Sequence, residues 1–348
     1  MTKRLFKNFL ISLVLGIVIA LATSIFTFAT ATVSLSYSIT NLGSLGSGSC
    51  EALGINYASQ VVGYCSISRQ IQKAFLWQNG TMNSLDISGS LAFSYASAIN
   101  SSGQVVYNTD PGSHVMGKKV ILWQNGKTTN VNSADNSTIA YGLNNTGHVV
   151  GGYLGPAFLW YKGNMTSLGT LGGSGSGSVA YAINDSRQVV GGSQTNNAQS
   201  HAFLWQKGSI RDLGTLSGNY SEARSINKTA QVVGSSTFNN NSPSYVHAFL
   251  WENPKMKDLG TLGGNNSKAL AINNSGTIVG KSEISSGIEH AFLWKHGKMT
   301  DLNSRLPTNS GWELTTANAI NNRGQIVGKG KFNGETRAFL LTPVMVTN

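Results

Sequence analysis

The chain has 348 residues and a formal net charge of +11, yet only 11% of its residues are charged, against about 25% in an average soluble protein. Few carboxylates and many Gly, Ser, Asn and Thr residues favour an exported all-β protein with short strands. The basic residues are scattered rather than clustered. This distribution favours a solvated basic surface, or one that binds an acidic polysaccharide. Nucleic acid is not expected as a partner of an exported chain, despite the positive charge.

Residues 1–31 are typical of an export signal. Lys3, Arg4 and Lys7 precede a long apolar run, residues 9–28, and the small residues 29–31 end it. We expect cleavage after Ala31. The alternative is an uncleaved membrane anchor, because about 20 apolar residues can span a bilayer. Either form places the remaining chain in the periplasm, at the cell surface or outside the cell.

A seven-fold internal repeat of about 44 residues occupies residues 36–343 and predicts a single domain built from one recurring unit. Its most constant stretch resembles Ala-x-Ala-Ile-Asn. The asparagines that end this stretch are Asn56, Asn100, Asn144, Asn184, Asn227, Asn273 and Asn321. We number the copies one to seven after these residues.

Each copy contains four predicted strands. The Ala-Ile-Asn stretch is the first, a Gln-Val-Val-Gly run the second, an Ala-Phe-Leu-Trp run the third and a segment like Met299–Leu302 the fourth. Asn at the first and Gly at the fourth position of the first connection is typical of a type I turn, although Ser59, Arg187 and Ala230 replace the glycine. Two-residue connections ending in Gly predict tight hairpins between the third and fourth strands.

The ends of the repeat predict how it closes. Tyr37–Gly43 matches a fourth strand with no third strand before it, whereas the chain ends after a third strand, Ala338–Leu341. The sequence therefore predicts an all-β, seven-bladed β-propeller of four-stranded blades, a monomer whose last blade is completed by the N-terminal strand. Ala, Gly or Ser recurs four and two residues before each asparagine. Simple alternation would place both positions on one face, which favours this strand as the innermost one.

The two cysteines, Cys50 and Cys65, lie six residues before and nine residues after Asn56. Other copies carry serine at the same offsets, and these offsets face each other across an antiparallel hairpin. Because export favours oxidation, we predict a Cys50–Cys65 disulfide; a metal pair or free thiols are the alternatives.

A residue with a basic or polar tip begins most third strands. These candidate ligand-binding residues are Lys73, Lys119, His201, His247, His290 and Arg337. In a propeller they would surround the face whose loops enter the first and third strands. Trp312, in the loop before copy seven, is a further candidate as an exposed stacking residue. The alternative for the basic set is a local hydrogen bond repeated in each blade.

No catalytic set, metal site or cofactor motif recurs with the repeat. Asp212, Asp258 and Asp301 are replaced by Asn or Ser in other copies, which favours a turn or edge hydrogen bond over acid–base chemistry. The Leu-Gly-Thr-Leu-Gly-Gly run precedes a strand rather than a helix, so it does not predict a phosphate site.

With these motifs in hand, the chain is similar to the extracellular HAF-repeat proteins, named for a tripeptide that begins here at His201, His247 and His290. The resemblance implies an exported bacterial-type repeat protein, and it supplies no activity that can be assigned to particular residues. We therefore expect a non-catalytic propeller that binds a protein or glycan through one face. An extracytoplasmic glycan hydrolase or lyase with its site at the central mouth, and a purely structural surface protein, remain alternatives.

Overall fold

The structure is a computed structural model that describes residues 33–46, 48–69, 71–86, 93–110, 119–131, 138–152, 155–172, 177–238 and 245–347. The predicted export signal, residues 1–31, lies outside the described residues. The chain divides into two compact units, residues 1–35 with 345–348 and residues 36–344. The described residues of the first unit, 33–35 and 345–347, are all in strands. The second unit contains the repeat.

The described residues form short strands in a regular order, four to a copy. Copies one to three contain β2 (Ser49–Ile55), β3 (Val61–Ser68), β4 (Ile71–Gln78), β5 (Thr81–Ser84), β6 (Phe93–Ile99), β7 (Val105–Asp110), β8 (Lys119–Gln124), β9 (Lys127–Asn130), β10 (Ala140–Leu143), β11 (Val149–Gly151), β12 (Phe158–Tyr161) and β13 (Asn164–Ser167). Copies four and five contain β14 (Ser178–Ile183), β15 (Val189–Gln194), β16 (Ser200–Gln206), β17 (Ser209–Asp212), β18 (Ser221–Ile226), β19 (Val232–Thr237), β20 (Val246–Glu252) and β21 (Lys255–Asp258). Copies six and seven contain β22 (Gly263–Ile272), β23 (Ile278–Ile284), β24 (Glu289–Lys295), β25 (Lys298–Asp301), a 3₁₀ turn at Leu302–Arg305, β26 (Trp312–Ile320), β27 (Ile326–Phe332) and β28 (Glu335–Thr347).

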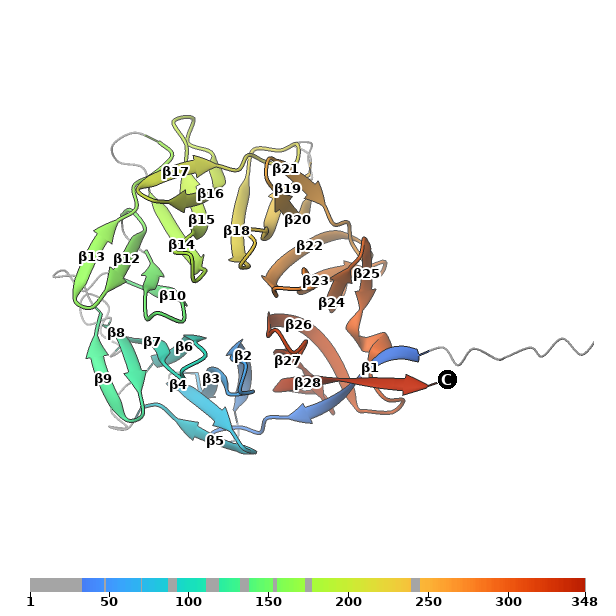
Figure 1. Ribbon diagram of the computed structural model, residues 1–348. Coiled ribbons are helices and arrows are strands. Elements are labelled where there is room, and N and C mark those ends of the chain that lie inside the picture. The colour runs from blue at the N-terminus through green and yellow to red at the C-terminus, as the bar shows by residue number, and fades with distance from the viewer. Residues whose placement is uncertain are drawn as a thin grey trace, which may run out of the picture. The chain divides into compact units, whose positions relative to one another are not determined.

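The strands pair into many small sheets, which residues 36–344 arrange around a central axis (Figure 1). Five sheets have four strands each. A sixth has eight strands and consists of the antiparallel groups β2–β5 and β6–β9, joined by one parallel pair, Gln72 with Phe93. In the last sheet the order is β1-β28-β27-β26, so β1 (Val33–Asn41) occupies the fourth-strand position. This strand order agrees with the sequence prediction for Tyr37–Gly43.

The turn between the first and second strands is the same in all seven copies. Its fourth residue donates its N–H to the carbonyl of the asparagine at 3.0–3.2 Å and adopts a positive φ. Ser59, Arg187 and Ala230 adopt φ values of 64°, 59° and 62° without being glycine. The hydrogen bond and the neighbouring sheets therefore impose the turn even where the side chain disfavours it.

Every first strand contains a β-bulge, and it corrects the expectation of simple alternation. Ala269 pairs with Gly280 and Ala271 pairs with Val279, so the two small residues oppose adjacent partners and lie on opposite faces. Ala269 packs with Ile272 against copy five. The second small position faces the next copy instead: a Cβ added to Gly142 would lie 3.1 Å from the Cα of Ala182.

The core lies between neighbouring sheets rather than at the axis. Each hydrophobic cluster combines residues of two consecutive copies, and the third-strand residues Phe203, Phe249 and Phe292 are fully buried in it. One cluster joins Leu42 and Phe75 from the start of the repeat to Val327 and Leu340 from its end. Burial of this apolar surface, at about 25 cal/mol per Å², holds each sheet against its neighbour.

The predicted disulfide is confirmed. Cys50 and Cys65 are directly opposed on β2 and β3 and form a disulfide, and both residues are buried. The corresponding serines are opposed in the same way in copies four, five and six, as Ser178 with Ser193, Ser221 with Ser236 and Ser267 with Ser282.

Candidate functional site

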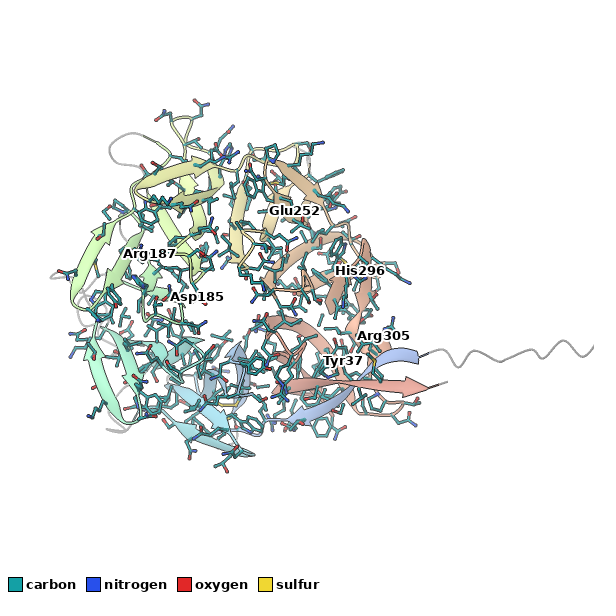
Figure 2. The ribbon with its side chains drawn as sticks, in the orientation of Figure 1. Tyr37, Asp185, Arg187, Glu252, His296 and Arg305 are labelled. Carbon is teal, nitrogen blue, oxygen red and sulfur yellow. A yellow bond between two sulfur atoms is a disulfide. The ribbon has the colours of Figure 1, made fainter. Side chains whose placement is uncertain are left out.

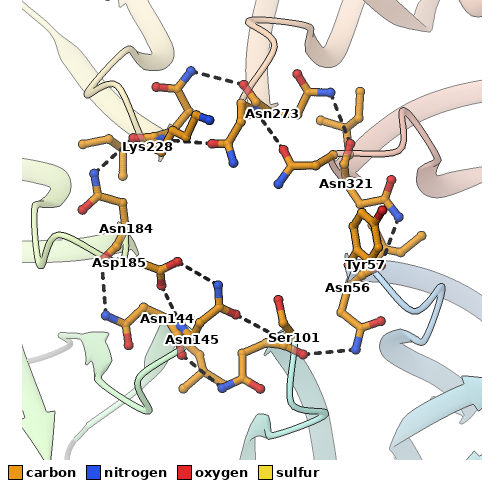
Figure 3. A pocket seen from close by; sticks show the side chains of 18 of the residues that line it. Asn56, Tyr57, Ser101, Asn144, Asn145, Asn184, Asp185, Lys228, Asn273 and Asn321 are labelled. Atoms are coloured by element: carbon orange, nitrogen blue, oxygen red, sulfur yellow. Dashed lines mark hydrogen bonds between the residues drawn. The ribbon is translucent and has the colours of Figure 1, made fainter.

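The seven repeated asparagines form a ring at one end of the sheets, here called the asparagine ring (Figure 3). Each asparagine is only 3–7% exposed. Its side-chain Oδ1 accepts the backbone N–H of the residue four positions later at 2.9–3.0 Å. This bond holds the side chain over its own turn and leaves Nδ2 directed toward the next copy.

Each Nδ2 donates to the backbone carbonyl of the asparagine in the next copy at 3.0–3.2 Å. The last of these bonds runs from Asn321 back to Asn56. In five copies Nδ2 also donates to a glutamine Oε1 four residues later, at 2.6–2.8 Å. The side chain thus uses both its acceptor and its donor, and neither Asp nor Gln offers both groups at this reach.

The ring forms the floor of a pocket of about 290 Å³, here called the axial pocket, to which all seven copies contribute. The residues that directly follow the ring asparagines surround its mouth and are all exposed. They are Tyr57, Ser101, Asn145, Asp185, Lys228, Asn274 and Asn322. Asp185 faces the central space from its sheet (Figure 2).

A second set of hydrogen bonds links the mouth residues, but it is interrupted. Ser101 donates its backbone N–H to Asn145, and Asn145 donates both its N–H and its Nδ2 to Asp185. Lys228 donates its N–H to Asn274, which donates its own to Asn322. In each of these pairs the side chain of the next mouth residue accepts a backbone N–H. Lysine has no side-chain acceptor, so the series is interrupted between Asp185 and Lys228. The residues around the mouth therefore differ in type and in hydrogen bonding, whereas the floor carries an asparagine in every copy.

The basic residues predicted as a ligand site lie at the opposite ends of the sheets. In copy four the ring turn adjoins Val189, whereas His201 pairs with Ser193 at the far end of β15. The Nδ1 atoms of His201, His247 and His290 each lie 2.7–2.8 Å from an Asp Oδ2 eleven residues later in the same sheet. For these three histidines, the contacts agree with the alternative interpretation, a local hydrogen bond repeated within each sheet.

Two further observations bear on the histidines. Burial acts most strongly on the Asp258 carboxyl and raises its pKa, but the hydrogen bonds from His247 and the Gly260 N–H together outweigh it and lower the pKa. The Nε2 atom of His201 is buried and has no partner within the described part of the chain. Of the two ring nitrogens of His201, Nδ1 therefore contacts Asp212 and Nε2 is shielded from solvent.

The remaining basic candidates are held in different ways. Lys73 forms an ion pair with Asp86 at 2.6 Å, and Arg337 pairs with Glu335. Lys119 is exposed and lines a cavity of about 240 Å³ together with Tyr95 and Asp110. The six basic residues do not converge on one shared pocket among those described, and their role as a ligand site stays a prediction.

Trp312 lies at the start of β26, beside a pocket of about 560 Å³ that is specific to copy seven. The ring centroid of Trp312 is 5.1 Å from that of Phe332 and 6.1 Å from that of Phe339. The pocket, here called the Trp312 pocket, is lined by Asn303, residues 306–313, Lys331, Asn333 and Gly334. It lies at the same end of the sheets as the predicted basic residues, because both come from loops that enter first and third strands.

The axial pocket was missed at the level of sequence. Its asparagines were identified as a marker of the repeat and assigned to the inner strands, but not to a site. A usable signal was present: the position after each asparagine varies between Tyr, Ser, Asn, Asp and Lys inside an otherwise constant stretch, and variable polar residues on a constant scaffold are typical of binding surfaces.

Within the described ranges, no group of three or more His, Cys, Asp or Glu side chains is arranged to hold a metal ion. In the same part of the chain, no helix is long and apolar enough to cross a membrane.

No protein-family model matches the chain, and no curated protein matches it. Solved structures do match. The β-propeller domain of the trilobed protease from Pyrococcus furiosus has a TM-score of 0.54 at 8% identity, covering 90% of this chain and 98% of that one. YCF48 from Cyanidioschyzon merolae has a TM-score of 0.53 at 8% identity, with 88% and 99% covered.

Larger structures match over a part of their length. The acylaminoacyl peptidase of Pyrococcus horikoshii has a TM-score of 0.55 at 10% identity, with 87% of this chain and 52% of that one covered. The extracellular domain of a hybrid two-component system from B. thetaiotaomicron has a TM-score of 0.52 at 10% identity, with 88% and 40% covered. The chain thus spans about half or less of these two proteins. At such identities the likeness concerns the fold alone: the chain is an all-β protein of propeller type.

Proposed function

We propose that the chain is an exported, monomeric seven-bladed β-propeller of the HAF-repeat type that binds a glycan without catalysing a reaction. Three observations support the blade count and closure. The asparagine bonds return from Asn321 to Asn56, β1 lies in the last sheet beside β28, and one hydrophobic cluster joins the first and last copies. The disulfide and the likeness to an extracellular domain support export.

The Trp312 pocket is the observation that carries the ligand assignment. Sugars are recognised by an aromatic face together with a few placed polar groups. Here Trp312 is braced by Phe332, and the lining adds an acid, a base and several amides. Glu313 and Lys331 are paired at 3.5 Å and partly exposed, so both remain accessible to hydroxyl groups of a ligand.

Binding is favoured over hydrolysis by the carboxylates that line the two pockets. Hydrolysis of glycosides generally uses a pair of carboxyl groups flanking the scissile bond. The described lining of the Trp312 pocket contains Glu313 as its carboxylate, and that of the axial pocket contains Asp185. Neither lining presents such a pair.

The test is a glycan array with the wild type, Trp312→Ala and Phe238→Ala. Phe238 is an exposed aromatic after β19 and serves as the matched control. We expect at least tenfold weaker binding for Trp312→Ala and unchanged binding for Phe238→Ala. Because Trp312→Ala removes packing, Glu313→Gln provides a second variant that should weaken binding with an unchanged unfolding midpoint. No glycan bound by the wild type, or equal binding by all variants, would overturn the proposal.

A further inference from the structure

We infer that the axial pocket is a separate binding site, for a small ligand that carries a carboxylate. The inference rests on the mouth residues of copies five, six, seven and one, and it is independent of the Trp312 pocket at the other end of the sheets. It follows from comparing the hydrogen-bonding groups that already have partners within the protein with the donors that still face the pocket.

The orientation of two amides at the mouth is fixed by the protein itself. Asn274 Oδ1 accepts the Lys228 N–H at 3.0 Å, and Asn322 Oδ1 accepts the Asn274 N–H at 2.9 Å. Only an oxygen can accept from an N–H, so the other end of each amide is the Nδ2 donor. Among the described residues no acceptor contacts either Nδ2, and both side chains are exposed at the pocket.

The adjacent charged and hydroxyl groups are donors as well. Lys228 lies next to Asn274 around the mouth and forms no ion pair within the described part of the chain. Tyr57 lies next to Asn322 and is 61% exposed. One arc of the mouth therefore presents an ammonium group, two amide NH₂ groups and a phenol.

The carboxylate of the same mouth is hydrogen-bonded on the side away from this arc. Both oxygens of Asp185 accept from Asn145, at 2.9 and 2.8 Å. Asn145 belongs to copy three, whereas Lys228 belongs to copy five, so Asp185 is engaged on the side away from Lys228. The floor is a poorer partner, since the ring asparagines are buried and each side chain already bonds through both Oδ1 and Nδ2.

A carboxylate fits this set because it has only acceptors and can receive several N–H bonds at once. The volume of about 290 Å³ is at the small end for ligand pockets, which suits a ligand no larger than a monosaccharide. The carboxylate could belong to a sugar acid or to the end of a peptide, and both share this chemistry.

The test uses ligand-observed NMR on the whole protein, purified in its exported form. The probes are glucuronate and N-acetylglycine, each compared with its uncharged counterpart, glucose or N-acetylglycinamide. We expect the acids to bind at least tenfold more tightly than the neutral forms. Preference for glucuronate would identify a sugar acid as the ligand class, and preference for N-acetylglycine a peptide end.

Two variants assign the binding to the arc. Lys228→Gln removes the charge but keeps the backbone N–H that Asn274 accepts. Asn274→Asp keeps the accepting oxygen and replaces the NH₂ donor by a second, negatively charged oxygen. Both should weaken acid binding at least tenfold. The matched control is Lys298→Gln, an exposed lysine on the outer strand β25, which should leave binding unchanged.

Equal binding of acid and neutral probes, no binding of either acid at millimolar concentration, or wild-type affinity in Lys228→Gln would overturn the inference. Trp312→Ala should bind the acids normally. Loss of acid binding in that variant would instead place the site at the Trp312 pocket, so failure of this inference and failure of the proposed glycan site give different results.

Discussion

In copies four to six, each end of the sheet carries a recurring polar residue, but the partners of the two residues differ. At one end the ring asparagines bond from each copy to the next. At the other end each histidine bonds to an aspartate of its own sheet. The asparagines are 3–7% exposed, whereas the aspartate side chains paired with His201, His247 and His290 are 26–43% exposed. Recurrence in the sequence therefore does not show whether a polar residue connects neighbouring copies. The asparagines do so, and the histidines bond within their own sheet.

This difference has an energetic consequence. Loss of one asparagine amide removes a buried hydrogen bond to the next copy, whose carbonyl then keeps only the N–H of its own turn. Loss of this buried donor costs about 1–3 kcal/mol. Loss of one histidine–aspartate contact exposes groups that water can reach, which typically costs 1 kcal/mol or less. The following predictions test that contrast, from the largest expected effect to the smallest.

Asn227→Asp should lower the free energy of unfolding by about 3 kcal/mol. The substitution keeps the acceptor for the Gln231 N–H but removes the two donations from Nδ2, to Asn273 O and Gln231 Oε1. A charged oxygen would then face two acceptors. Urea unfolding at pH 7 measures the loss, with Asn274→Asp, one layer outward and exposed, as the control. If Asn227→Asp lowered the free energy of unfolding by less than about 0.5 kcal/mol, the asparagine ring would contribute no more stability than the histidine–aspartate contacts.

The double variant Cys50→Ser, Cys65→Ser should lose about 2 kcal/mol. A closed loop of about 15 residues contributes about 3 kcal/mol in the chain-entropy account, and the separation here is 15. Serines in place of the cysteines can recover part of this stability. Ser221, at the position equivalent to Cys50, accepts the Ala202 N–H of the preceding sheet and donates to Gly214 O. Urea unfolding of the variant against the oxidised wild type measures this; an equal midpoint would show that the link between sheets replaces the covalent one entirely.

Asp258→Asn should cost about 1 kcal/mol at pH 7 and nothing at low pH. The pKa of Asp258 is lowered in the folded protein from its ordinary value of 3.8, because the hydrogen bonds from His247 and the Gly260 N–H outweigh burial. Its carboxylate therefore contributes stability that is fully present above that value and is lost as pH falls through the lower folded pKa. Unfolding midpoints of both proteins from pH 7 down to pH 2.5 should converge. A constant difference across the range would assign the effect to packing instead of charge.

Ala230→Gly should raise stability by about 0.5 kcal/mol. Ala230 has a φ of 62°, a region that costs a residue with a Cβ about 1 kcal/mol, and the greater flexibility of glycine in the unfolded chain offsets part of the gain. The reciprocal variant Gly276→Ala, at the same position in copy six, should be less stable than the wild type. Thermal unfolding distinguishes them, and changes of the same sign in both would contradict the explanation by φ.

The turns, strands and cysteine pairing could be predicted because they depend on neighbours in sequence. Cys50 and Cys65 stand at offsets that an antiparallel hairpin makes opposite. The bulge could not be predicted from alternation, because the inserted residue has no fixed side-chain type: Leu53, Tyr141 and Arg224 all occupy it. It reverses the face of Ala271 relative to Ala269, and only the register shows this.

The candidate sites divide in the same way. Trp312 was a candidate from the sequence because it interrupts the repeat. It was expected to be exposed but is only partly exposed, and its role as a stacking residue stays a prediction. The axial pocket was not predicted, because its residues are brought together across 40–48 residues of sequence by the packing of successive sheets. The sequence by itself determined the repeat, its four strands and its turns, since these follow from local backbone preferences and periodicity. Only the tertiary structure decided which donors bond to a neighbouring copy and which remain facing a pocket, since a hydrogen bond requires both partners to be in place.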